Sequence, residues 1–161
     1  MSHRVFMRLV LGGEVAAGAA PTFALGDLKM AGFSELLAFE YEMERDVDSN
    51  AQIRGHVELG QVSVFKQVDA ATPQIAQALA RGQTVECEIV ASTKDPDRGE
   101  VPHYRIQLLN GRLAGQELSA EAGEAPTEIL RIAYETIQLQ NLHGAATETE
   151  ISWTTGGNAL G

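Results

Sequence analysis

The chain has 161 residues, enough for one domain (residues 1–161) with a real core, and its 22 acidic and 12 basic side chains give a net charge of −10. Such a negative charge excludes affinity for the nucleic-acid backbone and for anionic membranes, because both are bound through Lys and Arg. The single cysteine, Cys87, excludes an intramolecular disulfide framework and fits folding in a reducing cytoplasm.

The N-terminal segment predicts a first strand over residues 4–11. Its apolar residues alternate at strand spacing: Val5, Met7, Leu9 and Leu11. The order basic, apolar, small resembles a signal peptide, but Arg8 interrupts the apolar run, so we expect none. No stretch approaches the ~18 apolar residues needed to cross a bilayer, so we expect no membrane insertion. Residues 12–32 are rich in Gly, Ala and Pro and predict a loop with a short strand near 22–25.

Residues 33–45 predict a half-buried strand. From Leu37 onward one face carries Phe39, Tyr41 and Met43, and the other carries Glu40, Glu42 and Glu44. Between Glu35 and Asp48 there are six acids and one base, Arg45. This acidic run is interpreted either as a channel lining or docking patch for a basic partner, or as a solvated strand face that guards against wrong pairing. Residues 46–55 predict a polar loop.

Residues 60–82 combine a strand with the one predicted helix. Residues 56–68 alternate as a strand with a bend at Gly60. Thr72 can cap a helix, and Pro73 suits its first turn because that turn lacks N–H partners. Ile75 and Leu79 are four residues apart and share one face, and Gly82 can take the left-handed conformation that ends a helix. We therefore expect a helix over Thr72–Arg81 that packs on the sheet.

The next predicted elements are a strand at 83–93, a hairpin loop at 94–100 and a strand at 101–109. Asn110–Gly111 has the composition of a tight hairpin turn. Only Leu113 and Leu118 would supply a new hairpin arm, so we expect a bulge or bend in a continuing strand instead.

The C-terminal part predicts a polar loop at 116–126, a long strand at 127–140 and a last strand at 147–153 that ends at the only tryptophan, Trp153. Both faces of the strand 127–140 are partly apolar, which indicates that one is covered by the core and the other by a second subunit. We expect intersubunit contacts at Ile129, Ile137 and Leu139. Residues 155–161 predict a flexible tail.

The sequence carries no pattern typical of an enzyme, a metal site or a cofactor site. It has no nucleophile elbow, no phosphate-binding loop, no HExxH and no cysteine pairs. His56 and Glu58 share a strand face and are the best metal candidates, although a solvated strand edge explains them as well. Cys87 lies between Val85 and Ile89 on an apolar face beside two glutamates, which favours an inert buried thiol. We therefore expect no catalytic, metal or cofactor residues.

Three segments resemble the Hcp family, the tube proteins of bacterial type VI secretion systems. In residues 65–82, the family pattern K–x–x–D–x–x–S/T–P…L…G matches Lys66, Asp69, Thr72, Pro73, Leu79 and Gly82. Residues 101–108 (VPHYRIQL) resemble the family's aromatic-x-Ile-x-Leu strand, and residues 126–140 (PTEILRIAYETIQLQ) resemble its P–x–E…Tyr–x–x–Ile strand. The resemblance spans residues 36–154 in the family's order. Residues 12–21 differ, because they are small and apolar where the family is polar.

This resemblance implies a mainly all-β fold, a two-sheet β-barrel with one short flanking α-helix. It also implies a homo-hexameric ring, stacking into tubes inside a contractile sheath, a spike protein at the tip and effector proteins in the lumen. Such a subunit would be cytoplasmic before firing and secreted afterwards. The alternatives are a monomeric β-barrel that binds a small ligand, with an apolar cavity, and a phage tail-tube protein.

Overall fold

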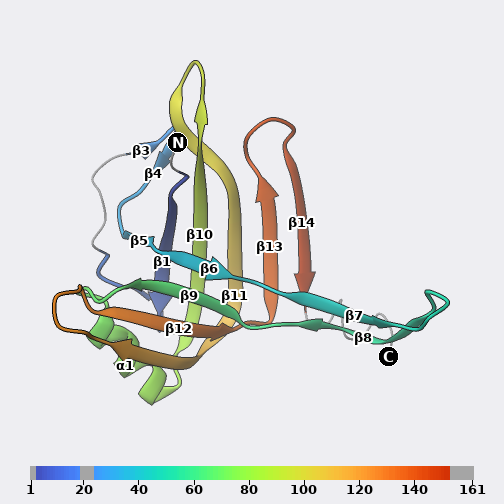
Figure 1. Ribbon diagram of the computed structural model, residues 1–161, viewed down its shortest axis with the longest axis horizontal. Coiled ribbons are helices and arrows are strands. Elements are labelled where there is room, and N and C mark those ends of the chain that lie inside the picture. The colour runs from blue at the N-terminus through green and yellow to red at the C-terminus, as the bar shows by residue number, and fades with distance from the viewer. Residues whose placement is uncertain (1–2, 19–23, 153–161) are drawn as a thin grey trace.

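The structure, a computed structural model, describes residues 3–18 and 24–152, and leaves out the side chains of residues 54–56. The fold is mainly β with one short helix, as predicted (Figure 1). Its elements are β1 (Val5–Leu11), β2 (Glu14–Val15), β3 (Ala24–Leu25), β4 (Leu28–Lys29), β5 (Phe33–Leu36), β6 (Ala38–Glu40), β7 (Met43–Val47), β8 (Ile53–Leu59), β9 (Val62–Gln67), α1 (Thr72–Arg81), β10 (Thr84–Asp95), β11 (Gly99–Ser119), β12 (Thr127–Ala133), β13 (Thr136–Asn141) and β14 (Thr147–Ser152).

The main sheet folds back on itself. Its hydrogen-bonded order is β2–β1–β10–β11–β12–β9–β6, with β5 also on β1, and β13 and β14 extending from β11. Only Leu37 separates β5, which pairs with β1, from β6, which pairs with β9. In Figure 1 the upright strands β1, β10, β11, β13 and β14 form one layer, and β6, β9 and β12 cross it as the other. This is the predicted two-layered arrangement.

The core lies between these layers and is closed at one end by the helix. Alternate residues of facing strands point inward and are fully buried, among them Val62, Val64, Ile89, Leu108, Leu130 and Ile132. Ile75 and Ala78 of α1 pack into the same cluster. A second, smaller cluster joins Phe6 and Val90 to Leu25, Met30 and Phe33, so the short strands β3 and β4 cover part of the outer side of β1 and β10.

Asn110 and Gly111 form the predicted bulge, and β11 continues through it to Ser119. Asn110 has a φ of 53°, and the register with β10 shifts beside it, between the pairs Cys87–Leu108 and Val85–Gly111. Before the bulge β11 pairs with β13, and after it with β12. The long strand therefore passes from one layer into the other.

The single strand predicted over 127–140 is wrong, because the chain breaks between β12 and β13. Glu135 lies in this break and donates its backbone N–H to Leu109 O at 3.2 Å, next to the bulge of β11. A strand that follows β11 must change layer where β11 does. The break between β12 and β13 therefore lies beside the bulge at Asn110, where the neighbouring strand changes layer.

The helix has the predicted bounds but a different N-terminal cap. The N-cap position is Ala71, which makes no side-chain cap bond, and Pro73 lies in the first turn. The Thr72 hydroxyl instead accepts the Asp69 N–H at 3.0 Å and donates to Glu128 Oε1 at 2.7 Å. Gly82 is left-handed, with φ 62°, and ends the helix as predicted.

The strands β7 and β8 form an arm that projects from the body (Figure 1). They pair only with each other, as a separate two-stranded sheet joined by the turn 48–52. The predicted bend lies at the base of the arm, where the Gly60 N–H donates to Glu42 O at 2.9 Å. A β-carbon on Gly60 would lie 2.7 Å from that oxygen, so only glycine fits this close approach.

Candidate assembly surface

The motif residues of 65–82 and 126–128 meet in a buried ion network. Lys66 Nζ donates to Asp69 Oδ1 at 2.8 Å and pairs with Glu128 Oε1, while both Lys66 and Glu128 are 1% exposed. Gln116 Nε2 donates to Glu128 Oε2 at 2.9 Å, and the Ser34 hydroxyl donates to Asp69 Oδ2 at 3.2 Å. We call these residues, with Thr72, the buried lock.

The buried lock joins four strands to the start of the helix. Its members come from β5, β9, β11 and β12 and from the Asp69–Thr72 turn, so it fixes α1 against both layers. Its ammonium group and both carboxylates are hydrogen-bonded within the protein. The one cavity that Ser34 and Lys66 line has a volume of only about 10 Å³. A fully satisfied network of this kind sets structure and leaves no group for chemistry.

The other polar candidates lie apart from one another. Cys87 is 3% exposed, and burial, with Glu88 nearby, raises the pKa of its thiol far above the ordinary value, so the thiolate is not available. His143 Nε2 lies 3.2 Å from Asp95 Oδ2, and His3 Nδ1 lies 3.0 Å from Ser92 O. The His56 side chain is outside the described residues. Across the described residues no three metal-ligating side chains cluster.

The arm has one apolar face and one acidic face. The register places Met43 opposite Leu59, Arg45 opposite Val57, and Val47 opposite Ile53. Residues paired in this way share a face, so these six form what we call the arm's apolar face. Val47 and Ile53 are 56% and 59% exposed, although they lie side by side. Glu44 and Glu58 lie opposite each other on the acidic face.

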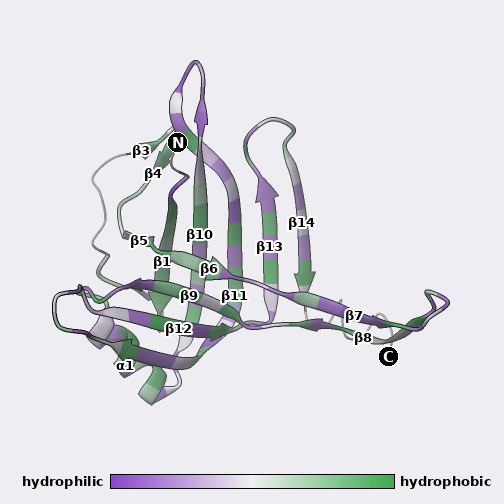
Figure 2. Ribbon diagram, viewed as in Figure 1, coloured by the Kyte–Doolittle hydropathy of each residue, from purple (hydrophilic) through white to green (hydrophobic). Residues whose placement is uncertain are grey.

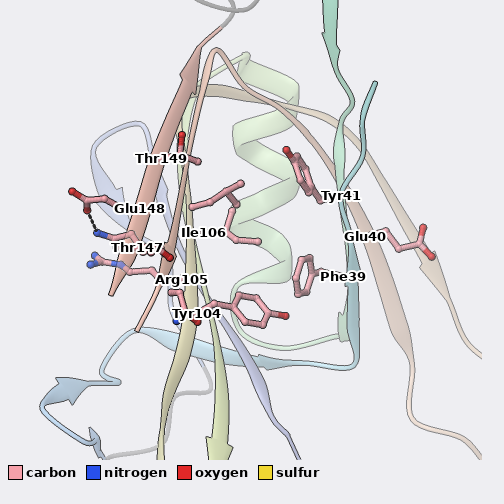
Figure 3. A pocket seen from close by; sticks show the side chains of 12 residues that line it. Phe39, Glu40, Tyr41, Tyr104, Arg105, Ile106, Thr147, Glu148 and Thr149 are labelled. Atoms are coloured by element: carbon pink, nitrogen blue, oxygen red, sulfur yellow. Dashed lines mark hydrogen bonds between the residues drawn. The ribbon is translucent and has the colours of Figure 1, made fainter. Parts of the chain in front are cut away.

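A groove of about 760 Å³ lies between β6 and the strands β11, β13 and β14. Phe39 and Tyr41 point into it from β6 and the segment after it, Tyr104 and Ile106 face them from β11, and Glu40 points away (Figure 3). This confirms the predicted alternation of residues 39–41. Leu139 and Thr149 complete the lining from β13 and β14.

Two tyrosines near the groove have buried hydroxyls. Neither Tyr41 Oη nor Tyr134 Oη has a hydrogen-bond partner within the described residues. Burial raises the pKa of Tyr41, and burial together with Tyr41 raises the pKa of Tyr134 to about 12. Both shifts favour the neutral phenol over the phenolate.

The groove and the arm form one surface. Alternation along the chain puts Met43, Arg45 and Val47 on the side of Phe39 and Tyr41. Residues 41–42 lie outside the strands, however, and the pairing register shifts there and again after Arg45. In the body the opposite layer covers this side, whereas along the arm Met43, Val47 and Ile53 are exposed and the other three residues are half-buried. Figure 2 shows apolar and polar residues interspersed along β7 and β8. A two-stranded ribbon with a partly exposed apolar face is marginally stable alone.

The three predicted interface residues fall in different places. Ile137 is 0% exposed and lies in the core, so its side chain has no surface left to bury against another subunit. Leu139 is half-buried and lines the groove. Ile129 is half-buried on the outer face of β12, next to Phe65 of β9. Ile137 therefore leaves the predicted set, and Ile129 and Leu139 remain predictions. Trp153 and residues 155–161 lie outside the described residues.

The sequence pattern does not reveal the arm or the buried lock. Residues 46–55 are polar enough to predict a loop, although Val47 and Ile53 flank the turn at the spacing of a hairpin. The lock residues stand out in the sequence only as motif positions. Their signal was Lys66 and Glu128, charged residues at core-facing positions of otherwise apolar strands, where a charge needs a partner.

The helix α1 has ten residues, and no helix within the described residues is long and apolar enough to cross a membrane.

A comparison with curated protein sequences finds no match. Among solved structures, a crystal structure of an Hcp protein is 13% identical with a TM-score of 0.80, covering 95% of this chain and 100% of its own. Hcp1 from the E. coli EAEC 042 pathovar is 20% identical with a TM-score of 0.76, covering 93% and 98%.

Secreted Hcp3 from Pseudomonas aeruginosa is 14% identical with a TM-score of 0.70, covering 94% of this chain and 99% of its own. At these identities the structures establish a shared fold. The family model described as "Type VI secretion system effector, Hcp" matches residues 26–140. That match spans more than half of the chain and includes the buried lock, the arm and most of the groove. The chain therefore belongs to the Hcp family of type VI secretion tube proteins.

Proposed function

We propose that this protein is a structural subunit of a type VI secretion tube, and that six copies form a ring. Rings stack into a tube inside a contractile sheath, with a spike protein at the tip and effector proteins in the lumen. The subunit is cytoplasmic until the system fires and is then exported. Its function depends on self-association, and it is not an enzyme.

The observation that carries this proposal is the bare apolar face of the arm. An exposed apolar ribbon costs solubility and stability in a monomer, so its presence supports a partner that covers it. The arm projects from one side of the body (Figure 1). A second copy that covers the arm therefore carries its own uncovered arm on its far side. Contacts of this head-to-tail kind generate closed rings or continuing filaments.

The groove also bears on the alternative of a monomeric ligand-binding barrel. Its volume of about 760 Å³ is within the usual range of small-molecule sites. Its apolar surface, however, runs on to the arm, far beyond the reach of a small ligand. This continuity favours a protein partner.

Mass measurement in solution with negative-stain electron microscopy tests the ring. We expect a hexamer mass and ring-shaped particles at micromolar concentrations. A single monomer mass over that whole range would contradict the proposal.

Export into the medium by a host with an intact secretion system tests the role. Val47→Asp should abolish export, because it places a carboxylate on the arm's apolar face, whereas Glu44→Ala on the acidic face should leave export intact. Alanine at His3, His103 or His143 should also leave export intact. A cytosolic marker excludes lysis. An indispensable histidine in a variant that still assembles would reveal a chemical site.

A further inference from the structure

Two hairpin turns lie next to each other at the end of the molecule opposite α1 (Figure 1). The turn between β10 and β11 begins at Asp95, and the turn between β13 and β14 carries His143. The Leu142 N–H donates to His103 O of β11 at 2.7 Å. His143 Nε2 lies 3.2 Å from Asp95 Oδ2. One backbone bond and one side-chain contact therefore join the β13–β14 turn to the β10–β11 hairpin.

The Asp95 carboxylate is fixed in place by its own turn. Its Oδ1 accepts the backbone N–H groups of Asp97 at 2.8 Å and of Arg98 at 3.0 Å, and its Oδ2 lies 3.5 Å from the Arg98 guanidinium. The Asp97 N–H and, next, the His143 side chain lower the pKa of Asp95 from 3.8 to about 2. Asp95 therefore keeps its negative charge throughout the range in which histidines titrate.

His143 is the partner in this contact that can change its charge. Its side chain is 32% exposed, so water reaches the ring. From the β10–β11 turn it faces Asp95, with Arg98 on the same carboxylate, and from β11 it faces His103, with ring centres 6.3 Å apart. A hydrogen bond from a charged imidazole to a carboxylate is roughly twice as strong as one between neutral groups. The contact is therefore strongest while His143 carries its proton and weakens as pH rises and that proton is lost.

Asn141 connects this contact to the groove. Its Nδ2 donates to His143 O at 2.8 Å and to Ala145 O at 2.7 Å, so it holds the turn that positions the His143 ring. Asn141 also lines the groove, as does Thr147 at the start of β14. Among the described strands β14 pairs only with β13. The groove wall formed by β14 therefore depends on β13 and on this turn for its position.

We propose that His143 and Asp95 form a proton-sensitive latch, which holds the β13–β14 wall of the groove to the β10–β11 hairpin while His143 is protonated and loosens it when His143 is neutral. The latch goes beyond the proposed tube function and does not depend on it, because both of its groups belong to one chain. It makes the groove wall firmer under mildly acidic conditions than under alkaline ones.

Hydrogen exchange of the full chain, followed by mass spectrometry, tests the latch. Exchange is compared at about pH 5.5 and about pH 8, on either side of the ordinary histidine range, after correction for the intrinsic effect of pH on exchange. We expect protection of residues 141–146, which include the Leu142 N–H, to fall about fivefold at the higher pH, because the lost charge weakens the contact by about the strength of one hydrogen bond. Peptides from β12, which is remote from the latch, should show no such change.

Two matched variants assign the effect to one ring. His143→Gln keeps a hydrogen-bond donor that cannot gain charge, so its protection should change less than about twofold between the two pH values. His103→Gln removes the neighbouring titratable ring and keeps the backbone oxygen that accepts the Leu142 N–H, so it should retain the full change. If His143→Gln fails to fold, Asp95→Asn, which removes the fixed charge, should show the same loss of pH dependence.

The outcomes separate the latch from the tube. No pH dependence in the unsubstituted protein, full dependence in His143→Gln or, in its place, Asp95→Asn, or its loss in His103→Gln would each overturn the latch. The solution mass is recorded at both pH values. A monomer at both would contradict the tube function and leave the latch standing, because the exchange comparison is made within one chain.

Discussion

At the scale of single residues, the most consequential side chains are those of the buried lock. One ammonium group, Lys66 in β9, serves two carboxylates, Asp69 in the turn before α1 and Glu128 in β12. Burial of charge costs free energy that the internal hydrogen bonds must offset. The network therefore contributes more to selecting one arrangement of helix and sheets than to total stability.

Removal of Lys66 should be severe. Lys66→Met leaves Asp69 and Glu128 without a cation, and we expect it to lower the free energy of unfolding by about 3–5 kcal/mol. The double variant Lys66→Met with Glu128→Leu should recover part of that loss, because it also removes the unpaired charge. Arg98→Met, which breaks the exposed pair with Asp95, should change stability by only ~0–1 kcal/mol. Urea unfolding measures all three, and a harmless Lys66→Met would contradict the role of the lock.

Asp95 predicts an acid-dependent contact between two hairpin turns. The backbone N–H of Asp97 and, next, the His143 side chain lower the pKa of Asp95 from 3.8 to about 2. Because the folded value is depressed, the ionised carboxylate stabilises the fold above about pH 4, and this contribution is lost as pH falls through about 2. His143→Ala should raise the pKa of Asp95 toward its ordinary value. An NMR titration of the carboxyl carbon measures it, and an unchanged value would show that His143 contributes nothing.

At the scale of elements, the structure ranks the two apolar anchors of the helix. Ile75 is fully buried, whereas Leu79 is only half-buried against the same core cluster. The sequence pattern alone treats them as equivalent, because both lie on one helical face. Tertiary packing distinguishes them, because the core cluster encloses Ile75 and only partly covers Leu79.

Truncation of the two anchors should therefore differ. Ile75→Ala should cost about 2–5 kcal/mol, because it leaves a cavity in a closed core. Leu79→Ala should cost about 1–2 kcal/mol, because solvent reaches part of the space that it vacates. Thermal or urea unfolding compares them. Equal costs would mean that Leu79 is buried in solution.

At the scale of the whole molecule, charge opposes the proposed assembly. Each copy carries a net charge of −10, and the arm adds the acidic face with Glu44 and Glu58 at the point where copies meet. The contacts that favour association are mainly apolar. Repulsion between copies is long-range, so salt should weaken it more than it weakens the apolar contacts.

Assembly should therefore strengthen as salt rises. Between about 0.01 M and about 0.15 M NaCl the screening length falls from about 30 Å to about 8 Å. We expect the concentration at which half of the subunits are assembled to fall over this range, as measured by sedimentation velocity. The opposite trend would indicate that ion pairs between copies dominate the contact.

The sequence by itself determined the local features of this protein. Alternation in residues such as Val62, Val64, Ile89 and Leu108 determined the strands, and Pro73 with Gly82 determined the helix bounds, because these signals act within a few residues. The motif positions were sufficient to indicate the family. The bulge at Asn110 was also predictable, because Leu113 and Leu118 are too sparse to form a separate hairpin arm after Asn-Gly.

Only the tertiary structure decided how these elements combine. It split residues 127–140 into two strands, because a strand paired with β11 must change layer where β11 does. Thr72 belongs to the buried lock instead of capping the helix, because its hydroxyl donates to Glu128, which is distant in sequence. The tertiary structure also buries Ile137 in the core and leaves Val47 and Ile53 exposed to solvent. Burial is set by what packs on a face, and alternation reveals that a strand has two faces without revealing which one the rest of the molecule covers.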